Sequence, residues 1–225
     1  MTNLKHRTVD ILLLRHGQTE ANRAGVLQGH QPTSLNLTGV RQATLLANRL
    51  AGFRPQVDVL ITSDLPRAVQ TAGPIAAACG LRPVLDHAWR ERTFGLLEGK
   101  PVGDRQLWQT AGGEVDPPGA EPTARMQKRI QVAITDLTSD YPKAHLIAVT
   151  THGGPIRSVL RMFSSGLLRL ARGQTLPEVP QIYNCSILHL QARHYRDGVK
   201  WRVVSVNDIS HLADVSAVSP VHAGE

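Results

Sequence analysis

The order of apolar and polar positions along the chain predicts short buried strands that alternate with amphipathic helices. Val9–Leu14 is a continuous apolar run apart from Asp10, and such runs are typical of strands that are covered on both faces. The expected strands are Val9–Leu14, Val57–Ile61, Leu81–Leu85, Leu146–Val149, Ser186–Gln191 and Trp201–Val206.

Apolar residues at helical spacing fill most of the segments between these strands. An N-cap at Thr38 begins the first expected helix, and Ser63 and Asp64 are candidate caps for the second. The expected helices are the segment after Thr38 with Val40, Ala43, Ala47 and Leu50 on one face, then Leu65–Cys79, Thr123–Leu137 and Pro155–Phe163.

Strands that alternate with helices imply a three-layer α/β/α sandwich, with a mostly parallel central sheet and helices on both faces. A chain of 225 residues, 41% of them hydrophobic, is long enough for one sizeable core, so residues 1–225 are expected to form a single domain. Residues 99–122 are rich in Gly and Pro and are expected to form a loop or lid-like insert. Residues 213–225 are expected to be a flexible C-terminal tail.

The net charge of +7 and the pI near 10.0 are compatible with nucleic acid, an anionic membrane surface or a small anionic substrate as partner. Aromatic residues make up 4% of the chain and the basic residues are scattered, which favours a basic globular protein without nucleic acid. The first apolar run is too short for a signal peptide or a membrane span, and Cys79 and Cys185 form no disulfide framework. A cytoplasmic protein that binds no membrane is therefore expected.

Two of the expected strands end in the same way, "LLLRHG" at the first and "AVTTHGG" at the fourth. Ligands of open parallel sheets bind outside the carboxyl ends of the strands, so we expect His16 and His152 to meet there. A histidine at such a place is a catalyst, a hydrogen-bonded bystander or a zinc ligand. The zinc interpretation fits poorly, because Arg15 would repel a cation and no carboxylate or cysteine lies at ligand spacing.

The stretch "ITSDLPRAVQTA" places Arg67 in the first turn of a helix, where the helix dipole disfavours a cation. Arg67 is then either an exposed member of a surface ion pair or part of an anion site that includes the helix end. With Arg15 it supplies two planar guanidinium groups, which match phosphate oxygens.

Four motifs in this order, "LLLRHGQTEAN", "SDLPRAVQTA", "RERTFGLLEG" and "THGGPIR", resemble the histidine phosphatase superfamily in its phosphoglycerate-mutase-like branch. The resemblance implies that His16 is a nucleophile that becomes a phosphohistidine and that Glu91 is the acid/base. For Glu91 an ion pair with Arg90 or Arg92 is the alternative. The site residues that the resemblance implies are His16, Glu91, His152, Arg15 and Arg67 for catalysis, and Asn22, Gln28, Gly29 and the backbone N–H of Gly153 for substrate binding.

The same resemblance implies no metal and no cofactor, since arginines compensate the phosphoryl charge. Glu98 is expected to have a supporting role, and Gln28 is otherwise a solvated loop residue. Leu107 and Trp108 are expected either to line the pocket or to pack in the core.

The superfamily contains both mutases and phosphatases. The insert is short and has no adjacent arginine pair, which favours a phosphatase. Its "PPGAEP" resembles the "PGGES" of the small phosphatases, from which Ala120 and Pro122 depart. The expected function is a metal-independent phosphomonoesterase that acts on small phosphorylated metabolites through a phosphohistidine. Mutase-type transfer, a non-catalytic phosphate-binding module and a homodimeric assembly stay open.

Overall fold

A computed structural model describes residues 7–104, 109–110, 113–114, 116–164, 179–196 and 198–213. Within these residues, a central sheet of six strands has the order β3-β2-β6-β1-β7-β8. The first four of these are mutually parallel, β7 is antiparallel to β1, and β8 is antiparallel to β7. The strands are β1 (Thr8–Arg15), β2 (Val59–Thr62), β3 (Val84–Leu85), β6 (Leu146–Thr151), β7 (Ile187–Tyr195) and β8 (Gly198–Asp208).

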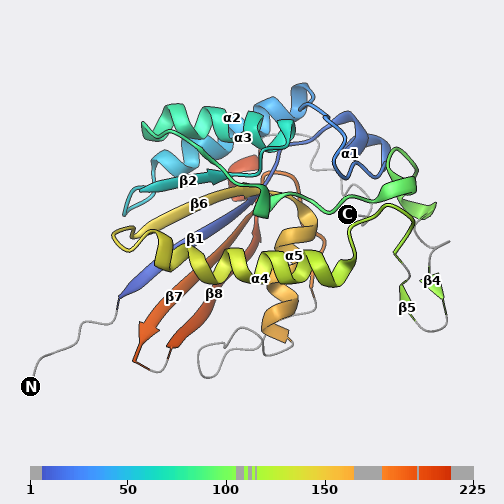
Figure 1. The fold of residues 1–225 in the computed structure, drawn as a ribbon. Coiled ribbons are helices and arrows are strands. Elements are labelled where there is room, and N and C mark those ends of the chain that lie inside the picture. Colours follow the sequence, from blue (N-terminus) through green and yellow to red (C-terminus); the bar gives the residue numbers. More distant parts are fainter. Residues whose placement is uncertain are drawn as a thin grey trace, which may run out of the picture.

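Helices cover both faces of the sheet, which confirms the predicted sandwich (Figure 1). On one face lie α2 (Leu37–Ala51) and α3 (Pro66–Cys79), and on the other lie α4 (Thr123–Asp140) and α5 (Gly153–Ser164). Alternate residues of β1 separate the two cores: Ile11 and Leu13 pack with the α4–α5 side, and Leu12 and Leu14 with the α2–α3 side. This burial on both faces explains why the strand is a continuous apolar run.

The beginning of α2 differs from the sequence prediction. Its N-cap is Asn36, whose side chain accepts the N–H of Gly39 at 2.8 Å, and Thr38 already lies inside the helix. Val40 was expected on the core face but is 52% exposed. The helix begins earlier because Asn36 also donates to the side chain of Gln18 at 2.9 Å, which anchors the cap to the loop after β1.

The beginning of α3 and the length of β3 also differ from the prediction. The N-cap position of α3 is Leu65, with no side-chain cap, and Pro66 fixes the first turn. Ser63 and Asp64 contact other elements instead. The strand expected at Leu81–Leu85 is reduced to Val84 and Leu85, because only these residues pair with β2.

The insert is not wholly a loop, since β4 (Gln109–Thr110) and β5 (Gly113–Glu114) pair antiparallel within it. A fifth helix, the short α1 (Glu20–Ala24), follows β1 and was not predicted. Leu107, Trp108 and the tail beyond Ala213 lie outside the described residues. Lid closure therefore stays a prediction.

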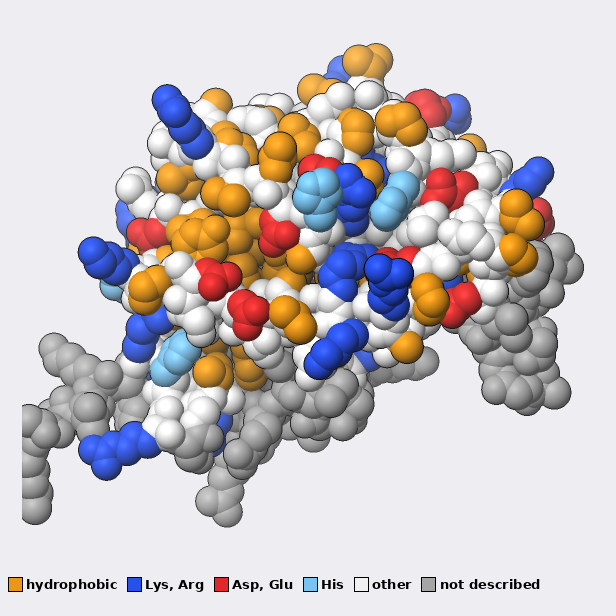
Figure 2. Space-filling model, viewed as in Figure 1, with side chains coloured by type: hydrophobic (Ala, Val, Ile, Leu, Met, Phe, Trp, Pro, Cys, Tyr) orange, Lys and Arg blue, Asp and Glu red, His pale blue; other side chains and the backbone are white. Residues whose placement is uncertain are grey.

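The edge strand β3 leaves Val84 and Leu85 exposed beside α4. They line a hollow of about 490 Å³ together with Val132 and Tyr141. Figure 2 shows this apolar area between the sheet edge and α4, with acidic side chains around it. The homodimer stays a prediction.

In the part of the chain that the structure describes, no helix is long and apolar enough to cross a membrane.

Candidate active site

The register of the two central strands brings the two histidines together. In the parallel pair of β1 and β6, Arg15 lies opposite Thr151, so the next residues, His16 and His152, leave the sheet at the same edge. Their ring centroids are 5.1 Å apart with an interplanar angle of 59°. Both side chains are fully buried.

Two contacts of His16 define its tautomer. The Nδ1 atom lies 2.7 Å from the carbonyl oxygen of Gly17, which only accepts, so Nδ1 carries the proton. The Nε of Arg67 donates to Nε2 at 3.2 Å, so Nε2 presents its lone pair. The backbone after His16 packs closely against α2, because a Cβ on Gly17 would lie 2.6 Å from the carbonyl oxygen of Gly39.

Arg67 is fully buried at the beginning of α3, so the interpretation as an exposed surface ion pair is wrong. Its Nη2 donates to the carbonyl of Gly29 at 2.8 Å, and its Nη1 to Gln31 and Thr33 at 3.3 Å each. Arg15 is also buried and donates to the carbonyl of Ile182 at 2.5 Å. Two buried guanidinium groups therefore flank the histidines.

His152 is held by Ser63, which follows β2 as His16 follows β1. Its Nε2 lies 2.8 Å from the hydroxyl oxygen of Ser63, and its buried Nδ1 has no hydrogen-bond partner among the described residues. Burial, followed by the positive charges of Arg67 and other neighbours, holds the pKa of His152 well below its ordinary value. His152 is therefore neutral near pH 7.

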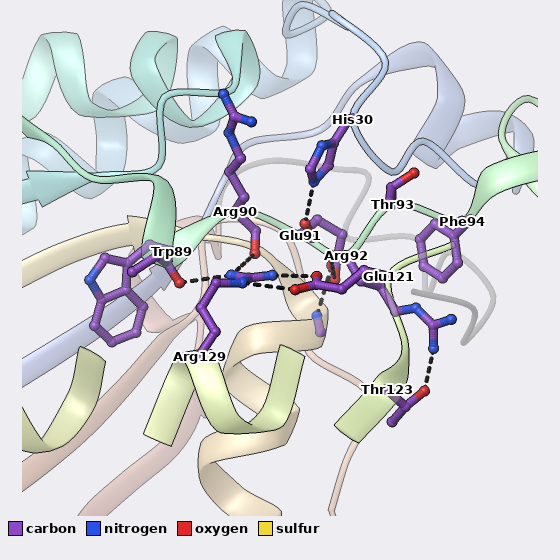
Figure 3. A network of polar contacts seen from close by, with 12 residues as sticks. His30, Trp89, Arg90, Glu91, Arg92, Thr93, Phe94, Glu121, Thr123 and Arg129 are labelled. Atoms are coloured by element: carbon purple, nitrogen blue, oxygen red, sulfur yellow. Dashed lines mark hydrogen bonds and ion pairs between the residues drawn. The ribbon is translucent and has the colours of Figure 1, made fainter. Parts of the chain in front are cut away.

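The carboxylate of Glu91 is fully buried between two backbone donors. The N–H of Gly154 donates to Oε2 at 2.9 Å, and the N–H of Arg92 donates to Oε1 at 3.0 Å. The ring of His30, which the sequence analysis did not single out, donates from Nε2 to the backbone carbonyl of Glu91 at 2.8 Å (Figure 3).

The alternative ion pairs for Glu91 are wrong, because both neighbouring arginines have other partners. Arg90 binds Asp64 with two nitrogens, and this contact lowers the pKa of Asp64. Arg92 pairs with Asp116 of the insert at 2.7 Å.

Three of the predicted substrate-binding residues, Asn22, Gln28 and Gly29, follow His16 in the chain, and the fourth, Gly153, begins α5. Asn22 is the third residue of α1, and its side-chain oxygen accepts hydrogen bonds from Thr19 and Asn184. Gln28 is fully buried rather than solvated, and its oxygen accepts from the hydroxyls of Thr19 and Thr33 at 2.9 and 2.6 Å.

Glu98 fixes the backbone of the same loop, in keeping with the supporting role expected for it. Its Oε1 accepts from the N–H of His30 at 3.0 Å and from the hydroxyl of Thr93 at 2.7 Å. Gly29 has φ +50°, and a Cβ there would lie 2.0 Å from Glu98 Oε1. Glycine is therefore favoured at this position.

Sequence reasoning missed three residues that contact the predicted site, namely Ser63, His30 and Asn184. Asn184 donates from Nδ2 to the carbonyl of His16 at 2.9 Å, and so fixes the turn that carries the ring. Ser63 stands directly after an apolar strand, which is the signal that singled out His16. No local pattern marks His30.

The fold and the site define an α/β protein in which two buried histidines and two buried arginines meet at the carboxyl edge of a mostly parallel sheet. The chain belongs to the histidine phosphatase superfamily (branch 1), whose family model matches residues 11–209.

The relatives of this chain include proteins named as mutase-like and proteins named as phosphatases. Phosphoglycerate mutase-like protein 4 of Arabidopsis thaliana is 31% identical over 96% of this chain and 92% of its own length. The metal-independent phosphoserine phosphatase of the same plant is 29% identical over 94% and 87%. The structure of mycobacterial glucosyl-3-phosphoglycerate phosphatase has a TM-score of 0.73 and 25% identity over 89% of this chain and 99% of that one.

Proposed function

We propose that this protein is a metal-independent phosphomonoesterase that hydrolyses small phosphorylated metabolites through a phosphohistidine on His16. The observation that carries the proposal is the tautomer of His16. Nδ1–H donates a hydrogen bond to the carbonyl of Gly17, and the lone pair of Nε2 faces the guanidinium of Arg67. This is the state that a nitrogen nucleophile requires.

In the first step, Nε2 of His16 attacks phosphorus, the P–N bond forms, and the bond to the leaving oxygen breaks. Glu91, as the acid, gives its proton to that oxygen. In the second step, Glu91 takes a proton from water, the water oxygen attacks phosphorus, and the P–N bond breaks to release phosphate. The N–H groups of Gly154 and Arg92 fix the carboxylate of Glu91 in both steps.

Compensation of the phosphoryl charge falls to Arg15, Arg67 and His152. When the hydroxyl of Ser63 donates to Nε2 of His152, the ring proton of the neutral histidine lies on Nδ1. This Nδ1 is buried and has no hydrogen-bond partner among the described residues. We assign that N–H to a phosphate oxygen. The backbone N–H of Gly153 at the beginning of α5 and the side chain of Asn22 are further proposed phosphate contacts, with Gln28 and Gly29 beside the substrate.

Mutase-type transfer is the second candidate function, because one relative is named phosphoglycerate mutase-like. In that reaction the phosphohistidine returns its phosphoryl group to a second alcohol rather than to water. The short insert without an arginine pair supports hydrolysis.

The test is turnover of p-nitrophenyl phosphate and of a panel of sugar phosphates, phosphoglycerates, nucleotides and phosphoamino acids, with mutase activity measured alongside. The wild type is expected to release phosphate and to form an acid-labile phosphoenzyme on rapid quench. His16→Ala is expected to fold and to do neither. Mutase turnover well above hydrolysis would reverse the order of the two candidates. A folded wild type without turnover would favour a phosphate-binding module.

A further inference from the structure

Arg129, on the side of α4 that faces the sheet edge, contacts the backbone of the segment that leads into Glu91. Its Nη1 donates to the carbonyl of Ala88 at 2.8 Å and to the carbonyl of Arg90 at 3.0 Å. Figure 3 shows the guanidinium between α4 and this segment, directed toward its backbone and toward Glu121. Within the part of the chain that the structure describes, Arg129 therefore acts on Glu91 through main-chain atoms.

The rest of the same guanidinium is occupied by Glu121, at the end of the insert. Nε and Nη2 of Arg129 donate to the two carboxylate oxygens at 3.0 and 2.6 Å. The side chains are 22% and 13% exposed, so the pair is largely removed from solvent. The N–H of Glu121 donates to the carbonyl of Thr93 at 3.0 Å. The pair thus anchors the chain before and after Glu91.

This anchoring matters because the segment has no regular structure of its own. Residues 90–93 belong to no helix or strand, and η1 (His87–Trp89) before them is a single short turn. The carboxylate of Glu91 has two backbone donors, and one of them, the N–H of Arg92, moves with the segment. The position of Glu91 relative to His16 therefore depends on what holds residues 88–93.

We propose that Arg129 and Glu121 are a positioning pair for Glu91, which they hold at the distance from the leaving oxygen that proton transfer requires. The inference rests on the proposed function, in which Glu91 is the proton donor. A displacement of about 1 Å is enough to cost a positioned group roughly a hundredfold in rate. The contact also joins the end of the insert to the catalytic segment.

The test is the dependence of kcat/KM on the leaving group. An alkyl phosphate such as glycerol phosphate leaves as a strongly basic alkoxide and needs the proton, whereas p-nitrophenyl phosphate leaves as a stable phenolate and needs it less. In Arg129→Met the ratio of the two kcat/KM values, alkyl over p-nitrophenyl, is expected to fall roughly tenfold or more. The ratio does not depend on the folded fraction of the enzyme, so instability alone does not move it.

Three further variants complete the experiment. Glu121→Gln is expected to lower the ratio as well, and the double variant to lower it by less than the product of the single effects, since both act on one segment. Arg49→Met removes a comparable, partly exposed ion pair, that with Asp208, and is expected to leave the ratio unchanged. An unchanged ratio in Arg129→Met would overturn the positioning pair.

Failure of the proposed function itself has a different signature. Glu91→Gln is expected to lower the ratio at least as far as Arg129→Met. If the wild type has no turnover, or if Glu91→Gln leaves the ratio unchanged, then the assignment of Glu91 is wrong. If Glu91→Gln lowers the ratio and Arg129→Met does not, then only the positioning pair is wrong.

Discussion

The amide of Gly154 donates to Glu91 at 2.9 Å, and a Cβ on Gly154 would lie 2.0 Å from the other carboxylate oxygen of Glu91. The second glycine after His152 therefore provides both the donor and the space for the proposed acid/base. The contact therefore requires a glycine two residues after His152.

Gly154→Ala is expected to displace the carboxylate of Glu91 and to lower kcat/KM for an alkyl phosphate by about a hundredfold. Steady-state kinetics on the purified variant measure this. Gly52→Ala at the end of α2 is the matched control, because its Cβ meets one carbonyl oxygen at 3.3 Å. Near wild-type activity in Gly154→Ala would show that the carboxylate is not held where the structure places it.

Arg67→Lys keeps the charge but loses the planar fork that bonds His16 and the loop at Gly29 together. We expect kcat/KM to fall about a hundredfold, and competitive inhibition by inorganic phosphate to weaken. Thermal unfolding is measured in parallel, because the carbonyl of Gly29 loses its donor. Arg54→Lys, at an exposed arginine bonded to nearby carbonyls, is the control. Equal phosphate inhibition in Arg67→Lys and wild type would contradict the assignment.

The lowered pKa of His152 predicts a pH dependence of stability. In the unfolded chain a histidine takes up a proton near its ordinary pKa of 6.5, while buried His152 stays neutral to a lower pH. The unfolded state therefore binds the extra proton below about pH 6.5, and the free energy of unfolding falls by up to about 1.4 kcal/mol per pH unit as the pH drops. Above that pH the contribution of His152 to the free energy of unfolding is fully present.

Urea unfolding between about pH 5 and pH 7 measures this slope, and His152→Gln is expected to reduce it. Part of the slope will persist, because burial also lowers the pKa of His194 and His211. Identical slopes for the variant and the wild type would contradict a neutral, buried His152.

Chelation is expected to leave activity unchanged. The cationic groups of Arg15 and Arg67 occupy the place that a metal ion takes in other phosphoryl-transfer sites. Turnover is compared before and after prolonged treatment with EDTA, with removal of the chelator as the control. A loss of turnover that added metal restores would refute the metal-independent mechanism.

Local pattern alone was enough for the central strands apart from the length of β3, for the layers and for the placement of His16 and His152. An apolar run reports burial on both faces, and the residue after a parallel strand lies at the carboxyl edge of the sheet whatever the remaining chain does. The four motifs likewise lie in continuous stretches, so the superfamily was recognisable without coordinates.

The helix ends were less predictable, because several polar residues can cap a helix. Thr38 and Asn36 are both good caps, and Asn36 is the one used, because it also bonds Gln18 on the loop after β1. In the same way, Ser63 and Asp64 bond His152 and Arg90 instead of capping α3.

By itself the sequence determined which residues are the candidates for the proposed chemistry, since their types and their positions at strand ends are local properties. Only the tertiary structure decided their partners. It paired Arg90 with Asp64 and left the carboxylate of Glu91 to the backbone, and it brought Arg129 of α4 under the catalytic segment. Such contacts join residues far apart in the chain, and packing and strand register set them rather than any local preference.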